Sequence, residues 1–263
     1  MDPIEENLAE SLILSAKEGR EKKAEPPEVR DIYFTVDHEP LYTTLDLELT
    51  PKKSILVDAS TVVAMDPSVT LMTKLRGGLL QNLAKILGRE VIVLNQFSAD
   101  SQAGHLRLAP PLPGDIHHYH LSDKKGLYLH SSHFLACKPT VQINTHFTGM
   151  QDFYNDDSTA LLHFTGQGDL WFSSCGGLLD VAVDETITFN PDYVLAFEDS
   201  LDYEVEVCEG LCADHLKENL FGGKGRLCRL RGEGQVWLQS RQDHSFLNYL
   251  KSFLPSVRTI EAP

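Results

Sequence analysis

The chain has 263 residues, of which 23 are Lys or Arg and 38 are Asp or Glu, so its formal net charge is −15. This charge argues against a protein that binds nucleic acid, because phosphate binding relies on Lys and Arg displacing counterions. The hydrophobic fraction of 42% is ordinary for a globular protein and excludes wholesale disorder. No apolar run approaches the roughly 20 residues that cross a bilayer, so no integral membrane segment is expected.

Residues 1–30 are predicted to form a charged helical extension. Ile4, Leu8 and Leu12 make a thin apolar stripe at helical spacing, and a Pro-Pro pair then ends it. The segment lacks the basic start and the apolar core of a secretory signal. The chain has 5 cysteines, an odd number that argues against a disulfide framework in a chain long enough to build its own core. We therefore expect a cytoplasmic protein.

After residue 30 the sequence changes to strand and turn patterns, with short alternating apolar stretches bounded by Gly, Pro, Asn and Asp. These patterns also repeat. The stretch Ile55–Asp58 is matched 72 positions later by Leu127–His130, and a further 60 positions on by Ile187–Asn190. Such self-similarity is the mark of a protein built from repeated units.

Each unit closes on a Gly-x-apolar-x-apolar stretch, beginning at Gly104, Gly168 and Gly234. We therefore predict a single all-β domain over residues 31–241, followed by a C-terminal helix and tail over residues 242–263. The domain holds three repeats, at about 41–108, 113–173 and 176–239.

Units of this size cannot bury an apolar face alone, so the three must pack around a shared core. The expected fold class is all-β, with three pseudo-repeated antiparallel units forming a prism or a stacked β-sandwich. In the middle unit, Ile116–Leu121 and Leu127–Cys137 flank a five-residue loop and are predicted to pair as a hairpin. Trp171 and Trp237 occupy equivalent places in two units, with Arg107 in the first, and are expected to pack in the core or between units.

Histidines gather in the middle unit, where five of the 11 lie within 17 positions. In the expected hairpin His118 faces His130, and the two-residue period of a strand puts His120 on the same face. Directly opposite Cβ atoms lie ~5 Å apart, close enough for imidazoles to share a transition metal at ~2.1 Å each. His118, His120 and His130 are thus the candidate metal ligands, with an open position that would suit zinc or ferrous iron.

The repeat itself favours a surface role for these histidines, because Asp46 stands where the middle unit has His118 and Asn190 stands where it has His130. Tolerance of any polar residue is typical of a solvated face. The other metal candidate is a set of three cysteines and one histidine: Cys208, Cys212, His215 and Cys228. Its spacing is not one that structural zinc sites prefer, and Cys228 aligns with an interior position, which favours a buried thiol.

Four stretches of the sequence resemble one family: Leu83–Glu90, Pro113–Ile116, Phe164–Gly168 and, most specifically, Gly232–Arg241 with its Gly-x-Gly-x-Val-Trp-Leu-Gln-Ser-Arg. The likeness extends over roughly residues 55–241, and the family is the altered-inheritance-of-mitochondria family. The resemblance implies repeated β-sandwich units similar to the tryptophan-RNA-binding attenuation protein and to a double-stranded β-helix, and a mitochondrial location for eukaryotic members. The family has no agreed catalytic residues, and a fold shared with an RNA binder does not imply RNA binding.

The function that these features favour is a non-catalytic structural or interaction protein, an adaptor or assembly protein. The sequence has neither the nucleophile motif of serine hydrolases nor the helix-borne metal motif of metalloproteases. We expect a homo-oligomer that binds other proteins, without a cofactor and without nucleic acid. The alternative is a metal-binding enzyme or sensor that uses His118, His120 and His130.

Overall fold

The computed structural model of the chain describes residues 31–72, 94–144, 161–207, 226–242 and 253. The predicted N-terminal helical extension lies outside these residues, as does nearly all of the predicted C-terminal helix. No helix within the described residues is long and apolar enough to cross a membrane.

The described part of the chain is built from β-strands that recur in three sets of six, preceded by β1 (Ile32–Asp37). The first repeat contains β2 (Thr44–Leu49), β3 (Ser54–Asp58), β4 (Val62–Met65), β5 (Val69–Met72), β6 (Leu94–Ala99) and β7 (Gly104–Leu108). The second contains β8 (Ile116–Leu121), β9 (Leu127–His130), β10 (Phe134–Cys137), β11 (Val141–Asn144), β12 (Leu161–Gly166) and β13 (Gly168–Ser173). The third contains β14 (Leu178–Val183), β15 (Thr186–Phe189), β16 (Val194–Glu198), β17 (Asp202–Val207), β18 (Arg226–Arg231) and β19 (Gly234–Gln239).

A single 3-10 turn separates the second and third strands of every repeat: η1 (Ala59–Thr61), η2 (Ser131–His133) and η3 (Pro191–Tyr193). Before the first and third of these turns, Asp58 and Asn190 accept a hydrogen bond from the backbone N–H two residues on, at 3.0 Å and 3.1 Å. Each bond satisfies a donor that the short turn leaves open. His130 occupies the same place in the second repeat. The polar residue thus caps the turn in the first and third repeats, whereas the side chain of His130 makes no capping hydrogen bond.

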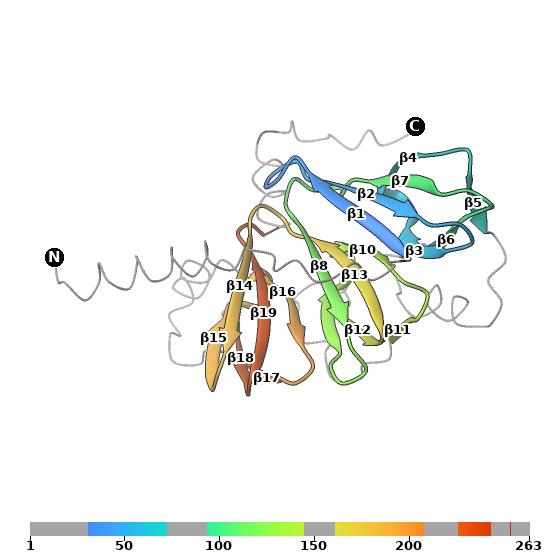
Figure 1. Cartoon of the computed structure of the whole chain (residues 1–263). Coiled ribbons are helices and arrows are strands. Elements are labelled where there is room, and N and C mark those ends of the chain that lie inside the picture. The colour runs from blue at the N-terminus through green and yellow to red at the C-terminus, as the bar shows by residue number, and fades with distance from the viewer. Residues whose placement is uncertain (1–30, 73–93, 145–160, 208–225, 243–252, 254–263) are drawn as a thin grey trace, which may run out of the picture. The chain divides into compact units, whose positions relative to one another are not determined.

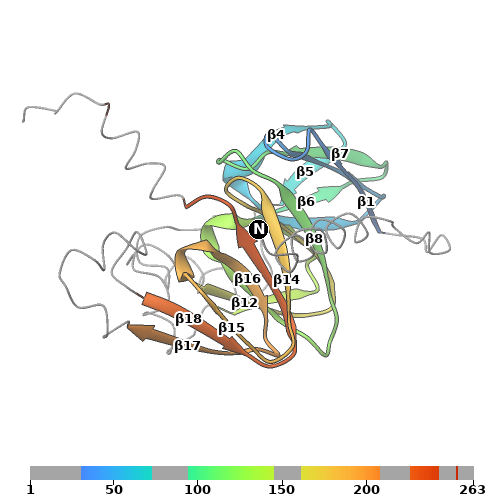
Figure 2. The ribbon, with the colours of Figure 1, turned by 90° about the vertical axis from the view of Figure 1, so that its left-hand side faces the viewer.

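The strands form four sheets (Figures 1 and 2). The strand orders are β1-β2-β7-β4 in the first sheet, β5-β6-β3-β10-β13-β8 in the second, β11-β12-β9-β16-β19-β14 in the third and β15-β18-β17 in the fourth. Buried apolar clusters lie between the first and second sheets, between the second and third, and between the third and fourth. The expected all-β class with three antiparallel repeats is confirmed, and the described sheets take the stacked form.

Successive repeats are joined because they share a sheet. In the second sheet β3 of the first repeat pairs with β10 of the second, with Val57 opposite Ala136. In the third sheet β9 of the second repeat pairs with β16 of the third, with Leu129 opposite Ala196. The two junctions have the same register, with equivalent residues 60 positions apart on one strand and 72 positions apart on the other, which makes them two copies of one strand-to-strand joint.

The predicted hairpin of the middle repeat is wrong. β8 pairs with β13 in the second sheet, whereas β9 pairs with β12 and β16 in the third. The exposed turn between β8 and β9 passes from the second sheet to the third instead of joining two strands of one sheet. Leu121 on β8 and Leu129 on β9 belong to the same buried cluster, which each reaches from its own sheet. Alternation of apolar residues is satisfied equally by facing across a core and by pairing in a plane, so the pattern could not separate the two.

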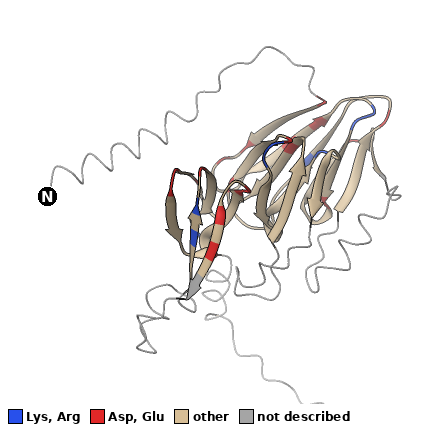
Figure 3. Cartoon of the chain, turned by 90° about the horizontal axis from the view of Figure 1, so that it is seen from below, with Lys and Arg blue, Asp and Glu red and all other residues tan. Residues whose placement is uncertain are grey.

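Charged residues are interspersed on the described strands. In Figure 3 acidic positions lie on several separate strands and turns, with basic positions among them. On neighbouring strands of the fourth sheet, for example, Arg231 and Glu204 form an ion pair at 3.1 Å. The acidity of the chain therefore includes its folded part.

Candidate functional site

A polar cluster within the described residues surrounds Asp169 on β13. Antiparallel pairing sets His120 of β8 directly opposite Asp169, with His118 two residues away on the same face. One carboxylate oxygen of Asp169, Oδ1, lies 3.0 Å from Nε2 of His118 and 2.8 Å from Nδ1 of His120. The other, Oδ2, lies 2.9 Å from Nζ of Lys138, which follows β10. One carboxylate thus holds three basic side chains together.

Asp169 remains ionised to strongly acidic pH. Burial by itself would raise the pKa of its carboxyl group, but hydrogen bonds from His118, His120 and Lys138 outweigh that effect and hold the pKa well below its usual value. Its side chain is only 17% exposed, against 28% for His118 and 56% for His120. The carboxylate is therefore a fixed negative centre at the base of the cluster, with the His120 ring as its solvent-facing part.

Aromatic packing holds His118 in place. Its ring centroid lies 4.6 Å from that of Phe34 on β1 and 5.3 Å from that of Trp171 on β13. The imidazole is thus wedged between two elements while its Nε2 reaches Asp169. A histidine fixed by packing on both sides is well suited to hold β1 against the second sheet, and poorly suited to the movement that proton transfer to a substrate requires.

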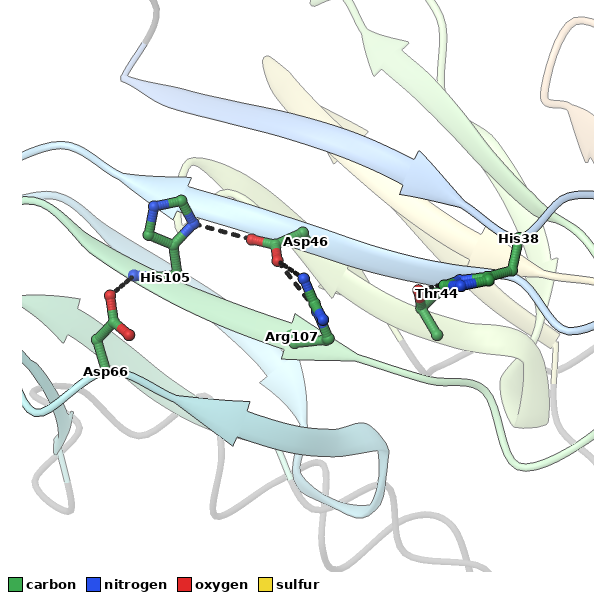
Figure 4. A network of polar contacts seen from close by, with 6 residues as sticks. All are labelled: His38, Thr44, Asp46, Asp66, His105 and Arg107. Carbon is green, nitrogen blue, oxygen red and sulfur yellow. Dashed lines mark hydrogen bonds and ion pairs between the residues drawn. The ribbon is translucent and has the colours of Figure 1, made fainter.

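The first repeat has the same kind of cluster with acid and base exchanged between the strands (Figure 4). Asp46 on β2 corresponds to His118, and His105 on β7 corresponds to Asp169. Nδ1 of His105 lies 3.0 Å from Oδ1 of Asp46, and Nη2 of Arg107 lies 2.6 Å from its Oδ2. The bond to Asp46 raises the pKa of His105. In both repeats, a carboxylate saturated by basic partners joins the first strand to the last strand.

The structure brings His118 and His120 together but places His130 in another sheet. His130 ends β9, where its Nδ1 lies 2.8 Å from Oγ of Ser132 and its ring faces His133 at 5.0 Å. The set of three facing imidazoles required the hairpin, and it is not formed. Within the described ranges, no group of three or more His, Cys, Asp or Glu side chains has the arrangement of a metal site. Metal binding by these histidines stays a prediction without geometric support.

The second zinc candidate falls mostly outside the described residues, since Cys208, Cys212 and His215 are not among them. Cys228 is described. It is fully buried on β18 in the cluster between the third and fourth sheets, and burial raises the pKa of its thiol to about 12. It acts there as a small apolar side chain, as its alignment with an interior position suggested.

His117 faces away from the Asp169 cluster, towards the third sheet, where its ring lies 5.2 Å from Phe172 and 5.5 Å from Trp237. Its pKa is lowered to about 4, first by burial and second by the neighbouring His118. An unfolded histidine has a pKa near 6.5. As the pH falls from about 6.5 to about 4, the unfolded chain therefore binds a proton that the folded chain refuses, so stability decreases.

We expect His117→Phe to reduce this acid sensitivity. Between about pH 7 and about pH 4.5 the decline in unfolding free energy should be smaller than in the wild type by roughly 2 kcal/mol. Urea titrations at a series of pH values would measure it. His120→Gln is the matched control, because His120 is largely exposed and its loss should leave the His117 contribution in place. Parallel pH profiles for wild type and His117→Phe would refute the assignment.

The starts of the three repeats meet at a junction that the sequence did not reveal. Tyr42, Gly114 and Gly176 are equivalent residues, and Gly114 forms parallel bridges with each of the other two. Oγ of Ser174 accepts a hydrogen bond from the N–H of Asp115 at 3.1 Å. One repeat later, Ser240 accepts one from the N–H of Gly177 at 2.8 Å. The backbone approach is close enough that a side chain at Gly114 would clash with the carbonyl oxygen of Ser174.

The Gln-Ser-Arg that ends the third repeat completes this junction. Oε1 of Gln239 accepts a hydrogen bond from the N–H of Cys175 at 3.0 Å, and both residues are buried. The N–H of Ser240 donates to the carbonyl of Gly177 at 2.9 Å. The triplet therefore ties the end of the third repeat to its own start. The serine of the triplet could have been identified from the sequence, because Ser174 and Ser240 are equivalent residues of two repeats.

Removal of the Gln239 side chain should test this role. We expect Gln239→Ala to lower the unfolding free energy by about 1–3 kcal/mol, because the buried N–H of Cys175 loses its acceptor. Chemical denaturation would give the value. Gln235→Ala on the same strand is a suitable control, since Gln235 bonds Glu198 through its backbone N–H and not through its side chain. Equal effects of the two substitutions would contradict the proposed role.

Comparison with known proteins places these features in a family. The sequence matches the family described as mitochondrial biogenesis AIM24 over residues 34–241. The chain belongs to the mitochondrial biogenesis AIM24 family. The match contains both carboxylate clusters and ends with the Gln-Ser-Arg triplet. It confirms the resemblance drawn from the sequence.

Two proteins of Streptococcus pyogenes are similar to this chain. An uncharacterised protein of Streptococcus pyogenes serotype M6 is 27% identical over 233 residues, which cover 85% of this chain and 91% of that protein. The crystal structure of a Streptococcus pyogenes protein, solved by structural genomics, is similar with a TM-score of 0.68 and 25% identity, over 85% of this chain and 100% of that one. The family and the fold are thus established, and the activity must be inferred from the chain itself.

Proposed function

We propose that this AIM24 chain is a non-catalytic structural protein that acts through protein–protein contacts, as an adaptor or assembly protein, and that it works as a homo-oligomer. The observation that carries the proposal is the way repeats are joined. The first and second repeats, and the second and third repeats, are joined by the same antiparallel strand pairing. A free sheet edge can pair in the same way with a strand of another chain.

The chemistry of the polar clusters supports the proposal. A general base must have a free lone pair near the proton that it takes, whereas Asp169 is held by three basic partners and Asp46 by two. Each carboxylate joins the two strands of a pair, and the packed ring of His118 joins two sheets. These contacts favour rigidity of the scaffold over turnover of a substrate.

The proposed compartment is the cytoplasm. The free thiols of Cys137 and Cys228 support this assignment, since both are buried and burial raises the pKa of both. Thiols kept in this state suit a reducing environment.

The test is complementation in cells that lack the native gene, with the full chain and two variants. His120→Gln removes the solvent-facing imidazole of the cluster, leaves the packed ring of His118 in place, and should correct the defect of those cells as well as the wild type does. Trp171→Ala, which removes a core side chain at a repeat junction, should not correct it. The proposal fails if the histidine variant is folded yet inactive and a metabolite screen shows turnover by the wild type alone.

A further inference from the structure

We propose that β4 of one copy of the chain pairs with β15 of a second copy, head to tail. The inference rests on the proposed function and names the partner of that assembly as the chain itself. β4 is an edge of the first sheet and β15 is an edge of the fourth. The four strands of the first sheet and the three of the fourth would make one sheet of seven, β1-β2-β7-β4-β15-β18-β17.

The strand order of this sheet is already present twice in the chain. The second sheet reads β8-β13-β10-β3-β6-β5, and the third reads β14-β19-β16-β9-β12-β11. By position in the repeat, β4 corresponds to β10 and β16, while β15 corresponds to β3 and β9. The sheet between two copies therefore reproduces both internal sheets strand for strand, with β1 as an addition at one edge.

The register of the new joint follows from the two internal ones. Ala136 lies opposite Val57, and Ala196 lies opposite Leu129. The equivalent residue of β4 is Ala64, so its partner on β15 should be Phe189. The pairing of β4 with β7 shifts register just before Ala64. The pairings of β10 with β13 and of β16 with β19 shift at the equivalent point, just before Ala136 and Ala196. The edge of β4 thus keeps the shape that the internal joints use.

The exposure of β4 differs sharply from that of its counterparts. Val63 is 61% exposed and Met65 is 52% exposed. Their counterparts in the two internal joints are apolar and fully buried: Leu135, Cys137, Leu195 and Phe197, each at 0%. Exposed apolar side chains on a strand with a free edge indicate an interface. A joint with β15 of a second copy would cover them as the internal joints cover theirs.

β15 presents a matching edge. Its sequence, Thr-Ile-Thr-Phe, has none of the Lys or Pro residues that commonly block edge strands. Ile187 and Phe189 remain half-buried there, whereas the equivalent Ile55 and Val57 on β3 are fully buried. The partner of β4 is β15 of a second copy, because within one chain β4 lies in the first sheet and β15 lies in the fourth. The second and third sheets lie between these two sheets.

The joint between copies should be weaker than the internal ones. The position of Trp171 and Trp237 is held in the first repeat by Arg107, which is bonded to Asp46 and half-exposed. A charged residue replaces a buried indole at this point of the interface, so less apolar area is removed from water. The assembly is therefore expected to dissociate on dilution, which an internal joint cannot do.

Sedimentation velocity of the full chain over a range of concentrations tests the proposal. The wild type should sediment at more than the single-chain mass of 29.4 kDa, and Met65→Asp should sediment as a single chain. Ser122→Asp is the control, because Ser122 is exposed in the turn between β8 and β9 and belongs to neither the first nor the fourth sheet. It should behave as the wild type does.

A disulfide pair tests the register independently. Ala64→Cys combined with Phe189→Cys should give an oxidised ladder of linked chains on a non-reducing gel, and each single variant should not. A wild type that sediments as one chain at all concentrations overturns the inference, as does an assembly unaffected by Met65→Asp. A wild type that sediments as one chain would also remove the homo-oligomer from the proposed function, whereas an assembly unaffected by Met65→Asp would leave it in place. The adaptor role is tested separately, by complementation and by a screen for turnover.

Discussion

Replacement of Trp171 by alanine is expected to lower the free energy of unfolding by about 3–5 kcal/mol, the cost of deleting a large buried aromatic side chain. Trp171 is 0% exposed in the cluster between the first and second sheets. It packs edge-on against Phe34 at 5.4 Å and lies beside His118. Its removal would leave a cavity where the second repeat meets β1, and thermal or urea denaturation would report the loss.

Two further variants make the Trp171 prediction specific. Within the described residues the indole Nε1 is buried without an acceptor, so Trp171→Phe removes an unsatisfied donor along with apolar volume and should cost much less than Trp171→Ala. Arg107→Ala changes the equivalent, half-exposed position of the first repeat and should alter stability little. If Trp171→Ala were no worse than Arg107→Ala, the packing account of this junction would be wrong.

Gly114→Ala is the second change with a large expected effect, a loss of about 3 kcal/mol or more. The added Cβ would clash with the backbone of Ser174 and approach the N–H of Gly176. Backbone atoms cannot move aside as the end of a flexible side chain can, so the row of bridges between repeat starts would have to open. Denaturation midpoints together with hydrogen exchange at the N–H of Asp115 would show both the loss and its location.

A neighbouring glycine provides the control for Gly114. At Gly177 an added Cβ would meet only Oγ of Ser240, at the ordinary contact distance of 3.7 Å. Gly177→Ala should therefore change stability little. An equal loss in both variants would indicate a general effect of backbone stiffness and would remove the close-approach argument.

The histidine cluster shows where local pattern and long-range pairing diverge. The side-chain period of a strand correctly placed His118 and His120 on one face. It could not show that Asp169, 49 residues beyond His120, lies opposite them. The exchange of acid and base between Asp46 with His105 and His118 with Asp169 is visible in the repeat, and it would have identified the partner without a structure.

The sequence alone determined the all-β class, the three repeats and the burial of the equivalent tryptophans, because apolar alternation and turn residues are local signals that recur in every copy. Only the tertiary structure decided which strands share a sheet, since β8 meets its partner β13 across 46 or more intervening residues and a hairpin would satisfy the same alternation. It also decided that His130 lies in another sheet from His118, and that β4 and β15 are edge strands among the described residues, because sheet edges are defined by pairing partners and not by the residues of the strand itself.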